Sequence, residues 1–325
     1  MGRKILFLAN QTDKHLGLFS DLKSDDRVIL HYVLKKKTDF ILKILRRIHL
    51  NRRLDWLDHK FPFRYVWYDC GKDISLSDIK YILVINSSLE KIDLNYLRKC
   101  KMKGICLILL ILDSINADSI TVHRNKHLYF LSLWDKVITY DPVDAHRYGF
   151  IYKGYCYYSK NNSFPMRAAP QNEVYFTGNT KGGRSTLIND TFLYFTANGC
   201  KCIYDVQLKD KKENRCQGIN YVQKWIKYED VLIRMSDCNC ILEIIQSGQN
   251  GPSLRYFEAI FYNRRLITNN KNVVGYPYYN PKWMKIIDKP EDVDIDWVKS
   301  KEIVDYQYKG DFSPVNFIDY LIGNE

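Results

Sequence analysis

The spacing of hydrophobic and polar positions divides the chain into two stretches in which short apolar runs alternate with helix-like segments. In the first stretch the apolar runs lie at 4–9, 27–33, 64–69, 81–86, 105–112 and 135–140, and helical spacing is found between 35 and 64 and at 89–101. Near-continuous apolar strands separated by helices are typical of a parallel sheet that is covered on both faces. The pattern therefore predicts an α/β domain over residues 1–150.

The rhythm stops at residues 151–172, which are rich in Tyr, Ser, Asn and Pro and are expected to form a linker. A second series follows, with strands predicted at 173–178, 200–205, 240–245 and from 265, and helices at 185–198 and 228–236. Gly199 stands where the first of these helices needs a C′ residue. We therefore expect a second α/β domain over 173–312 and a short C-terminal helix over 313–325. Two such domains in tandem predict ligand binding at the carboxyl ends of the strands, in the cleft between them.

Composition supports a folded, non-spanning protein. Hydrophobic residues make up 46% of the chain and aromatic residues 14%, which favours a globular protein over a disordered one. No apolar run reaches the roughly 20 residues that cross a bilayer. The apolar run at 4–9 is too short for a secretion signal and is expected to be a strand. These observations predict a cytoplasmic protein, either in solution or peripheral at the inner face of the cytoplasmic membrane.

The nine cysteines are expected to be reduced thiols that act as small buried hydrophobes. The pairs Cys200/Cys202 and Cys238/Cys240 raise the alternative of a zinc site, since alternate residues of a strand share a face. Each pair has a single residue between its cysteines, whereas structural zinc sites favour spacers of roughly two to four residues. We therefore expect no metal.

Positive charge is concentrated in one segment. The net charge is +12, and the stretch from Lys35 to Arg64 contains ten basic and three acidic residues. Its apolar residues recur at helical spacing, and the basic residues lie mostly off that stripe; they include Lys43, Arg46, Arg47, Arg52 and Arg53. Such a helix either lies on an anionic membrane or packs its apolar face on the core. Nucleic acid is the other polyanion to consider, but no zinc-finger, helix-turn-helix or RNP-type signature is found, and no nucleic-acid partner is predicted.

The segment 246–270 carries the strongest functional pattern. A loop with Gly248 and Gly251 follows the predicted strand, and Ser253 stands at an N-cap position before an amphipathic helix. Because the free N–H groups and the positive end of a helix attract anions, this geometry predicts a phosphate site. The residues expected to bind the ligand are Gln249, Asn250, Gly251, Ser253, Leu254, Arg255 and Glu258. Arg255 would neutralise a second phosphate and Glu258 would accept hydrogen bonds from sugar hydroxyls. The alternative is an ordinary strand–turn–helix.

A second glycine-bearing loop follows the first strand of the second domain. Gly178, Asn179 and Arg184 belong to it, and its glycines would let the backbone approach a ligand closely. The loop lacks the P-loop pattern, and the alternative is a simple glycine turn. If both loops face one cleft, they form a single anion site.

The order Ser-x-Arg-x-x-Glu-Ala before a strand that ends in Ile-Thr-x-Asn resembles the donor-site segment of GT-B glycosyltransferases. The resemblance is greatest to bacterial enzymes that build capsule, O-antigen or lipopolysaccharide chains. It covers 134–148, 173–184 and 240–270, with a weaker match at 276–280, and Pro252 departs from the family's loop. It implies two Rossmann-like domains that face a central cleft, a nucleoside-diphosphate-sugar donor and a glycan acceptor, which a lipid would carry. It implies no cofactor and no metal.

The same resemblance points to three catalytic candidates. Asp113 ends a buried strand in an Asp-Ser-Ile sequence that the family places on the acceptor side, where a carboxylate can act as a general base. Its alternative role is a helix N-cap. Asp13 and His15 follow the first strand, where GT-B enzymes often place acceptor or catalytic groups.

Other acidic residues have simpler interpretations. Asp141 and Asp144 fit a strand, Asp-Pro turn and short helix in the resembling family, and we expect both to cap that helix. Asp292 and Asp294 form an Asp-x-Asp pattern, which in GT-A transferases holds a metal. Here it falls after the second α/β series, and we interpret it as a solvated acidic turn.

Three hypotheses remain. The first is a metal-independent hexosyltransferase that acts on a surface glycan. The second is a sugar-nucleotide epimerase or hydrolase of the same fold, which would consume the donor without an acceptor. The third is a non-catalytic scaffold that binds nucleotide sugars at the membrane.

Overall fold

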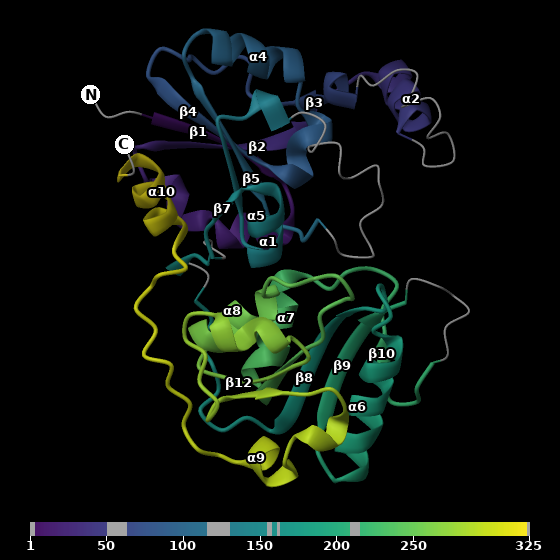
Figure 1. Ribbon diagram of the computed structural model, residues 1–325. Helices are drawn as coiled ribbons and strands as arrows, with labels where there is room; N and C mark the ends of the chain where they lie inside the picture. Colours follow the sequence, from purple (N-terminus) through teal and green to yellow (C-terminus); the bar gives the residue numbers. More distant parts are fainter. Residues whose placement is uncertain are drawn as a thin grey trace.

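Two predominantly parallel β-sheets, each in its own domain, organise the molecule, and Figure 1 shows one domain above the other. The computed structural model describes residues 4–50, 64–115, 131–154, 158–160, 163–208 and 215–323. Each sheet has helices on both faces, so the chain forms two Rossmann-like α/β domains, as the apolar pattern predicted.

The first sheet has seven strands in the order β3-β2-β1-β4-β5-β6-β7. The strands are β1 (Lys4–Asn10), β2 (Val28–Lys35), β3 (Tyr68–Asp69), β4 (Ile79–Ile85), β5 (Cys106–Ile111), β6 (Lys136–Thr139) and β7 (Ile151–Tyr152). All neighbouring pairs are parallel except β2 and β3. The α-helices around this sheet are α1 (Asp13–Leu18), α2 (Phe40–His49), α4 (Leu94–Met102) and α5 (Pro142–Tyr148), with 3₁₀ turns η1 (Ser20–Ser24), η3 (Arg64–Trp67) and η4 (Asn86–Lys91).

Alternation along each strand divides the core of this domain between the two faces of its sheet. Ile5 and Phe7 point to the face covered by α1 and η1, whereas Leu6 and Leu8 point to the face covered by α4. All four side chains are buried. Burial on both sides explains why the strands are apolar at nearly every position.

The second sheet has six parallel strands in the order β10-β9-β8-β11-β12-β13. They are β8 (Asn172–Asn179), β9 (Cys202–Gln207), β10 (Asn220–Tyr221), β11 (Cys238–Glu243), β12 (Arg265–Thr268) and β13 (Met284–Ile286). Its helices are α6 (Ser185–Ala197), α7 (Tyr228–Ser236), α8 (Leu254–Phe261) and α9 (Ile295–Lys299), with 3₁₀ turns η7 (Lys271–Gly275) and η8 (Pro290–Asp292). In this sheet β9 and β10 follow β8 on one side, whereas β11, β12 and β13 lie on its other side, so the strand order reverses between β8 and β11. In the first sheet the strand order reverses in the same way between β1 and β4. Ligands of such sheets bind where the order reverses, beyond the carboxyl ends of these strands.

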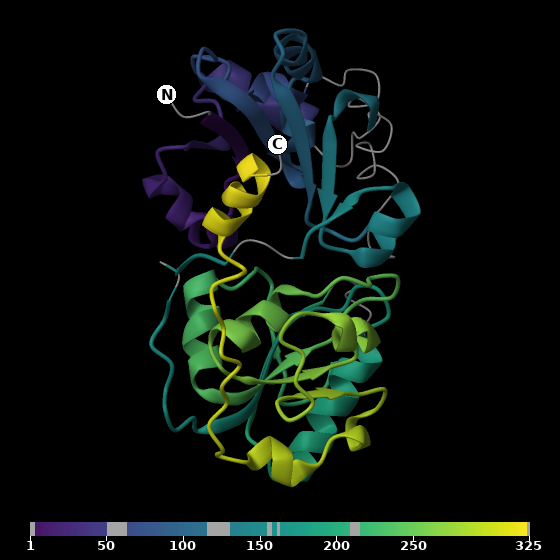
Figure 2. The ribbon, with the colours of Figure 1, turned by 60° about the vertical axis from the view of Figure 1, so that its left-hand side comes forward.

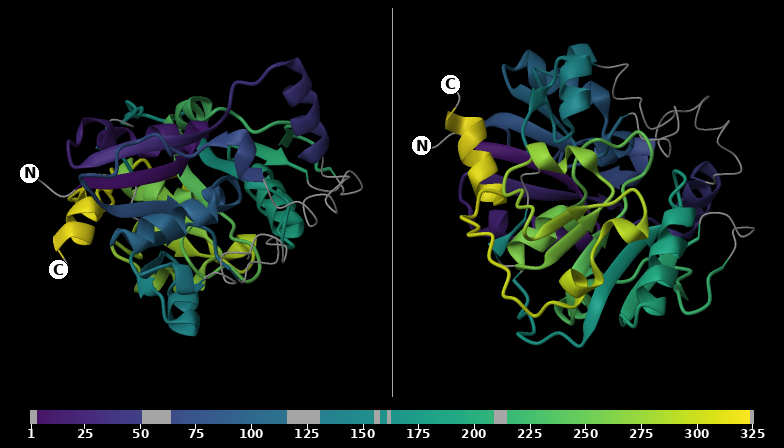
Figure 3. Two further views of the ribbon diagram at one scale, coloured as in Figure 1. Left: turned by 90° about the horizontal axis from the view of Figure 1, so that it is seen from above. Right: turned by 60° about the horizontal axis from the view of Figure 1, so that its bottom comes forward.

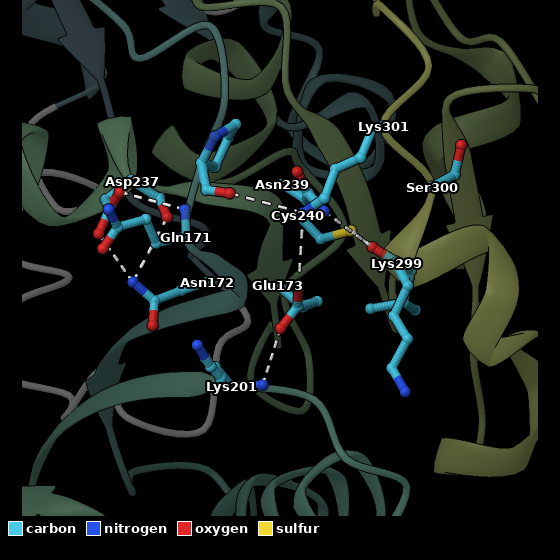
Figure 4. A network of polar contacts seen from close by, with 12 residues as sticks. Gln171, Asn172, Glu173, Lys201, Asp237, Asn239, Cys240, Lys299, Ser300 and Lys301 are labelled. Atoms are coloured by element: carbon cyan, nitrogen blue, oxygen red, sulfur yellow. Dashed lines mark hydrogen bonds and ion pairs between the residues drawn. The ribbon is translucent and has the colours of Figure 1, made fainter.

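The amino ends of the second sheet are closed by polar contacts. Figure 4 shows Asp237 beside Gln171 and Asn172, and the carboxylate of Glu173 accepts a hydrogen bond of 2.8 Å from the N–H of Lys201. Burial raises the pKa of the nearby Cys240 thiol to about 12, so this cysteine stays protonated. The cysteines in the described part of the chain are free thiols, as expected. These hydrogen bonds join the amino ends of β8, β9 and β11.

Two segments connect the domains. Residues 158–160 lie against η1, because Ser159 Oγ accepts the N–H of Asp21 and the carboxylate of Asp21 accepts the N–H of Lys160. The segment between α9 and the C-terminal helix leads back to the first domain and brings Phe312 against Phe257 of α8, with ring centroids 4.6 Å apart. The chain then ends its described course in α10 (Pro314–Gly323), which packs on the first domain beside η1 (Figure 2).

Two local predictions within residues 1–150 were wrong. Residues 64–67 form a 3₁₀ turn instead of a strand, and only Tyr68 and Asp69 pair with β2. The helix predicted over 89–101 is two elements, because the carboxylate of Asp93 accepts the N–H of Asn95 and starts α4 at Leu94. Neither change affects the strand order.

Helix α2 stands away from the sheet, as Figure 1 and the left view of Figure 3 show. None of its residues is buried, and the exposed fractions of Phe40 and Ile41 are 75% and 70%. The interpretation that its apolar face packs on the core is therefore wrong. Within the described residues, no helix combines the length and apolar character that crossing a bilayer requires.

Candidate functional site

The N-terminus of α8 lies beyond the carboxyl end of β11, where the strand order of the second sheet reverses. Ser253 is its N-cap: the side-chain hydroxyl accepts the N–H of Arg255 at 3.1 Å. The N–H of Ser253 itself donates to the buried carboxylate of Glu243, at 2.8 Å. The helix entry predicted from the sequence is thus present, and Glu243, which the sequence did not suggest, anchors it from its own domain.

Glu258 is fully buried on α8 within a chain of polar contacts. One carboxylate oxygen accepts the hydroxyl of Tyr228 at 2.7 Å, and the other lies 2.7 Å from the Arg255 guanidinium. The Tyr228 hydroxyl also meets that of Tyr158, at 2.8 Å, in the segment between the domains. Burial raises the pKa of Glu258, while Arg255 and the Tyr228 hydrogen bond act in the opposite direction. Arg255 therefore neutralises Glu258, in addition to any contact that it makes with a ligand.

Arg184 lies on the second loop, at the start of α6, and has no carboxylate partner among the described residues. Its guanidinium donates to the carbonyl oxygens of Lys181 and Ile244, each at 3.0 Å, and to the side-chain oxygen of Asn179. Burial lowers the pKa of this group to about 10, so it remains positively charged at pH 7. A half-buried cation that is held by neutral acceptors retains the capacity to attract an anion.

The two glycine-bearing loops pack directly on each other. Gly182 adopts a φ of +65°, and a Cβ added there would lie 2.6 Å from Cβ of Gln246. The N–H of Ser247 donates to the Gly182 carbonyl at 3.3 Å. Arg184, the carboxyl end of β8 with Gly178 and Asn179, and the entry to α8 therefore belong to one region of the second domain.

Lys14, on α1 of the first domain, was missed by the sequence interpretation, which selected its two neighbours. Lys14 is a half-buried residue whose ammonium group interacts electrostatically with Asp113 of its own domain and with Arg255 and Glu258 of the other. Burial lowers the pKa of Lys14, and Asp113 partly reverses this effect. Lys14 shows that the loop after β1, the end of β5 and helix α8 face one another across the two domains.

The three catalytic candidates differ in their surroundings. Asp113 is exposed just beyond β5. His15 is buried, with Nδ1 3.3 Å from the carbonyl oxygen of Asn10. Burial lowers the pKa of His15 to about 3, with Lys14 adding to the effect, so the imidazole is neutral and weakly basic at pH 7. Asp13 is the first residue of α1, whose N-cap is Thr12; its side chain lies outside the described part.

Asp141 has a larger role than the helix cap expected for it. One oxygen of its buried carboxylate caps α5 by accepting the N–H of Val143 and Asp144, at 2.9 and 3.2 Å. The other oxygen accepts the N–H of Asn250 and of Gly251, which belong to the loop that leads to α8 in the second domain. Asp141 is the N-cap of α5; Asp144 lies in the first turn of this helix, and its carboxylate accepts the N–H of Ile115 at 2.6 Å.

The remaining predicted residues are more peripheral. The side-chain N–H of Gln249 donates to the carbonyl of Gly251 at 3.2 Å, which keeps the loop compact. Lys43, Arg46 and Arg47 lie on α2, whereas Arg52 and Arg53 lie outside the described residues. Asp294 caps α9. Among the described residues, no group of three or more His, Cys, Asp and Glu side chains could hold a metal ion.

Comparison with known proteins identifies the fold. No protein-family model matches the chain, and no curated protein matches it significantly. A solved structure of an α-glucosyltransferase, in complex with UDP and a 13-mer DNA containing a central A:G mismatch, has a TM-score of 0.51 at 12% identity; the match covers 93% of this chain and 88% of that one. Two others are a UDP-N-acetylglucosamine 2-epimerase from Rickettsia bellii (TM-score 0.49, 10% identity, 100% and 97% covered) and a UDP-glucosyltransferase from Polygonum tinctorium (0.43, 11%, 92% and 89%). The first of these matches and the two Rossmann-like sheets show that this chain has the GT-B fold.

Proposed function

We propose that this protein is a glycosyltransferase that moves a sugar from a nucleoside-diphosphate donor to a growing bacterial surface glycan. The observation that carries the proposal is Arg184, a half-buried cation without a carboxylate partner in the described chain. It lies on the loop that packs on the segment leading to the N-terminus of α8, at the point where parallel sheets bind ligands. A diphosphate is the ligand that this combination of charge and helix dipole suits best.

The other proposed donor contacts come from both domains. Glu258 would accept hydrogen bonds from donor hydroxyls, and Lys14 would add a second cation from the opposite domain. During transfer, the bond between the anomeric carbon and the diphosphate oxygen breaks while the bond to the acceptor oxygen forms. The leaving diphosphate gains negative charge, which Arg184 and Lys14 would stabilise. These side chains would supply the positive charge, so we propose that no metal is required.

Asp113 is our candidate for the base that removes the acceptor proton. It is exposed on the first domain, near Lys14, and so could reach a hydroxyl that approaches from solvent. His15 is a weaker candidate, because an imidazole with a pKa of about 3 has little affinity for a proton at pH 7.

The exposed apolar and basic residues of helix α2 support the proposal that the acceptor is linked to a lipid. Its exposed apolar residues, such as Phe40 and Ile41, lie on the same short helix as Lys43, Arg46 and Arg47. An amphipathic basic helix of this kind binds anionic membranes through both its apolar area and its charge. We propose that α2 holds the protein at the inner face of the cytoplasmic membrane, where a lipid-linked glycan is available.

The first experiment is a thermal-shift screen of the purified protein against UDP, GDP, CMP and their sugars. A ligand at about 100 times its Kd should stabilise the fold by roughly 2.7 kcal/mol. Arg184→Ala should abolish the shift, whereas Arg167→Ala, which removes an arginine at the opposite end of the same sheet, should retain it. If well-folded wild-type protein shows no shift with any nucleotide, the proposal is wrong.

Incubation with the donor that binds separates the two enzymatic hypotheses. A transferase requires an acceptor for rapid release of the diphosphate, whereas an epimerase or hydrolase converts the donor alone. Binding without turnover under either condition would favour the scaffold. Co-sedimentation with vesicles of phosphatidylglycerol, compared with phosphatidylcholine vesicles, tests α2; lack of salt-sensitive binding would remove the membrane part of the proposal.

A further inference from the structure

The carboxylate of Asp141 joins the two domains at residues 246–253, the loop that leads to α8 and that we call the donor loop. A single oxygen, Oδ2, accepts the N–H of Asn250 at 3.1 Å and the N–H of Gly251 at 3.0 Å. The hydroxyl of Ser114, also from the first domain, donates to the same oxygen. Asp141 is fully buried, so these contacts are shielded from water and the two loop N–H groups are held by a charge.

The loop is also held from its own domain. Glu243 accepts the N–H of Ser253, and the Tyr276 hydroxyl donates to the carbonyl of Asn250. The backbone of 250–253 is therefore fixed by two buried carboxylates, one from each domain. The hydrogen bond from Ser253 to Glu243 lies within the second domain, so it does not depend on the position of the first domain. The hydrogen bonds to Asp141 exist only while the two domains are close together.

The shape of the contact explains the glycine in this loop. A Cβ added to Gly251 would lie 2.4 Å from a ring carbon of Tyr140 and 3.2 Å from Cα of Asp141. A side chain at this position would require the ring of Tyr140, or the first domain that carries it, to shift. Helix capping alone does not account for this arrangement, because the cap uses Oδ1 and would not require the loop to approach.

We propose that Asp141 is a positioning residue that couples domain closure to the shape of the donor loop. Resting on the proposed function, this assignment means that the first domain prepares the donor site as it closes: Asp141 fixes the N–H groups of Asn250 and Gly251 beside the entry to α8. A donor then meets a preformed loop in the closed molecule and a loosened loop in the open one.

Hydrogen–deuterium exchange tests the coupling in the ligand-free protein. In Asp141→Asn, the amides in peptides spanning 246–253 should exchange at least tenfold faster than in the wild type. Asp294→Asn, which alters another N-cap carboxylate that is exposed at the start of α9, should leave that segment unchanged. Gly251→Ala acts from the other domain, leaves the α5 cap intact, and should also accelerate exchange. Unchanged exchange in both Asp141→Asn and Gly251→Ala would overturn the proposal.

Nucleotide binding then tests positioning. With UDP as the first probe, followed by GDP and CMP, the Kd of Asp141→Asn should rise at least tenfold, and the donor KM should rise more than kcat falls. Tighter binding by the variant would mean that the carboxylate competes with the donor, which would overturn the positioning role. If the wild type binds no nucleotide, the proposed function fails, and the exchange data still decide whether Asp141 fixes the loop.

Discussion

The acid sensitivity of the fold should depend strongly on His15. Its pKa is about 3 in the folded protein and 6.5 when exposed, because burial disfavours the imidazolium. The unfolded state therefore binds a proton over this range while the folded state does not. Stability rises with pH in that window and is lost as pH falls from 6.5 toward 3, at up to about 1.4 kcal/mol per pH unit.

Between pH 7.5 and pH 5, this single group should lower the free energy of unfolding by about 2 kcal/mol. His15→Gln removes the titration, so its stability should decline less over the same interval, whatever constant offset the lost packing adds. Urea unfolding at steps of half a pH unit measures both curves. His146→Gln, on the exposed side of α5, controls for loss of an imidazole as such. Parallel curves for wild type and His15→Gln would refute the burial argument.

Three further predictions concern catalysis. Arg184→Ala should reduce kcat/KM at least tenfold, because the guanidinium has no carboxylate partner in the described chain and is available to a diphosphate; an unchanged value would remove it from the site. Glu258→Ala should also cost at least tenfold, and near-unchanged turnover in a folded variant would contradict its assignment. Asp113→Asn should lower kcat by about 100-fold or more with little change in donor Kd, as for loss of a general base, and an equal loss in Kd would point to binding instead.

Much of the fold could be predicted because burial on both faces makes parallel strands apolar throughout. The runs that became β1, β4, β5, β8 and β11 are of this type, and each was placed to within two residues. Residues 64–67 were different, because this segment lies at the edge of the sheet, where only Tyr68 and Asp69 pair with β2. The aromatic-rich residues before them therefore have no neighbouring strand with which to form backbone hydrogen bonds. The break before α4 was available from the sequence, since Asp93 is an N-cap type of residue.

The site was less predictable because some of its contacts, such as those of Asp141 with Asn250 and Gly251, cross between the domains. Periodicity identified Ser253 as a cap, and glycine spacing pointed to the loop around Gly251. Spacing along the chain does not reveal which surfaces meet, so it could not show that Asp141 reaches that loop. Lys14 was not predicted for the same reason: its charge interacts with Arg255 and Glu258 only because α8 of the other domain lies close to it.

The position of α10 has a consequence for biosynthesis. This helix buries Phe317, Ile318 and Leu321, and Asp319 forms an ion pair with Arg27, so the first domain is completed by residues that the ribosome makes after the whole second domain. At roughly 5–20 residues per second, the ribosome makes α10 many seconds after it has made the rest of the first domain. The two halves therefore cannot mature strictly in the order of synthesis, and a nascent chain shortened before Pro314 should present an uncovered apolar surface to chaperones.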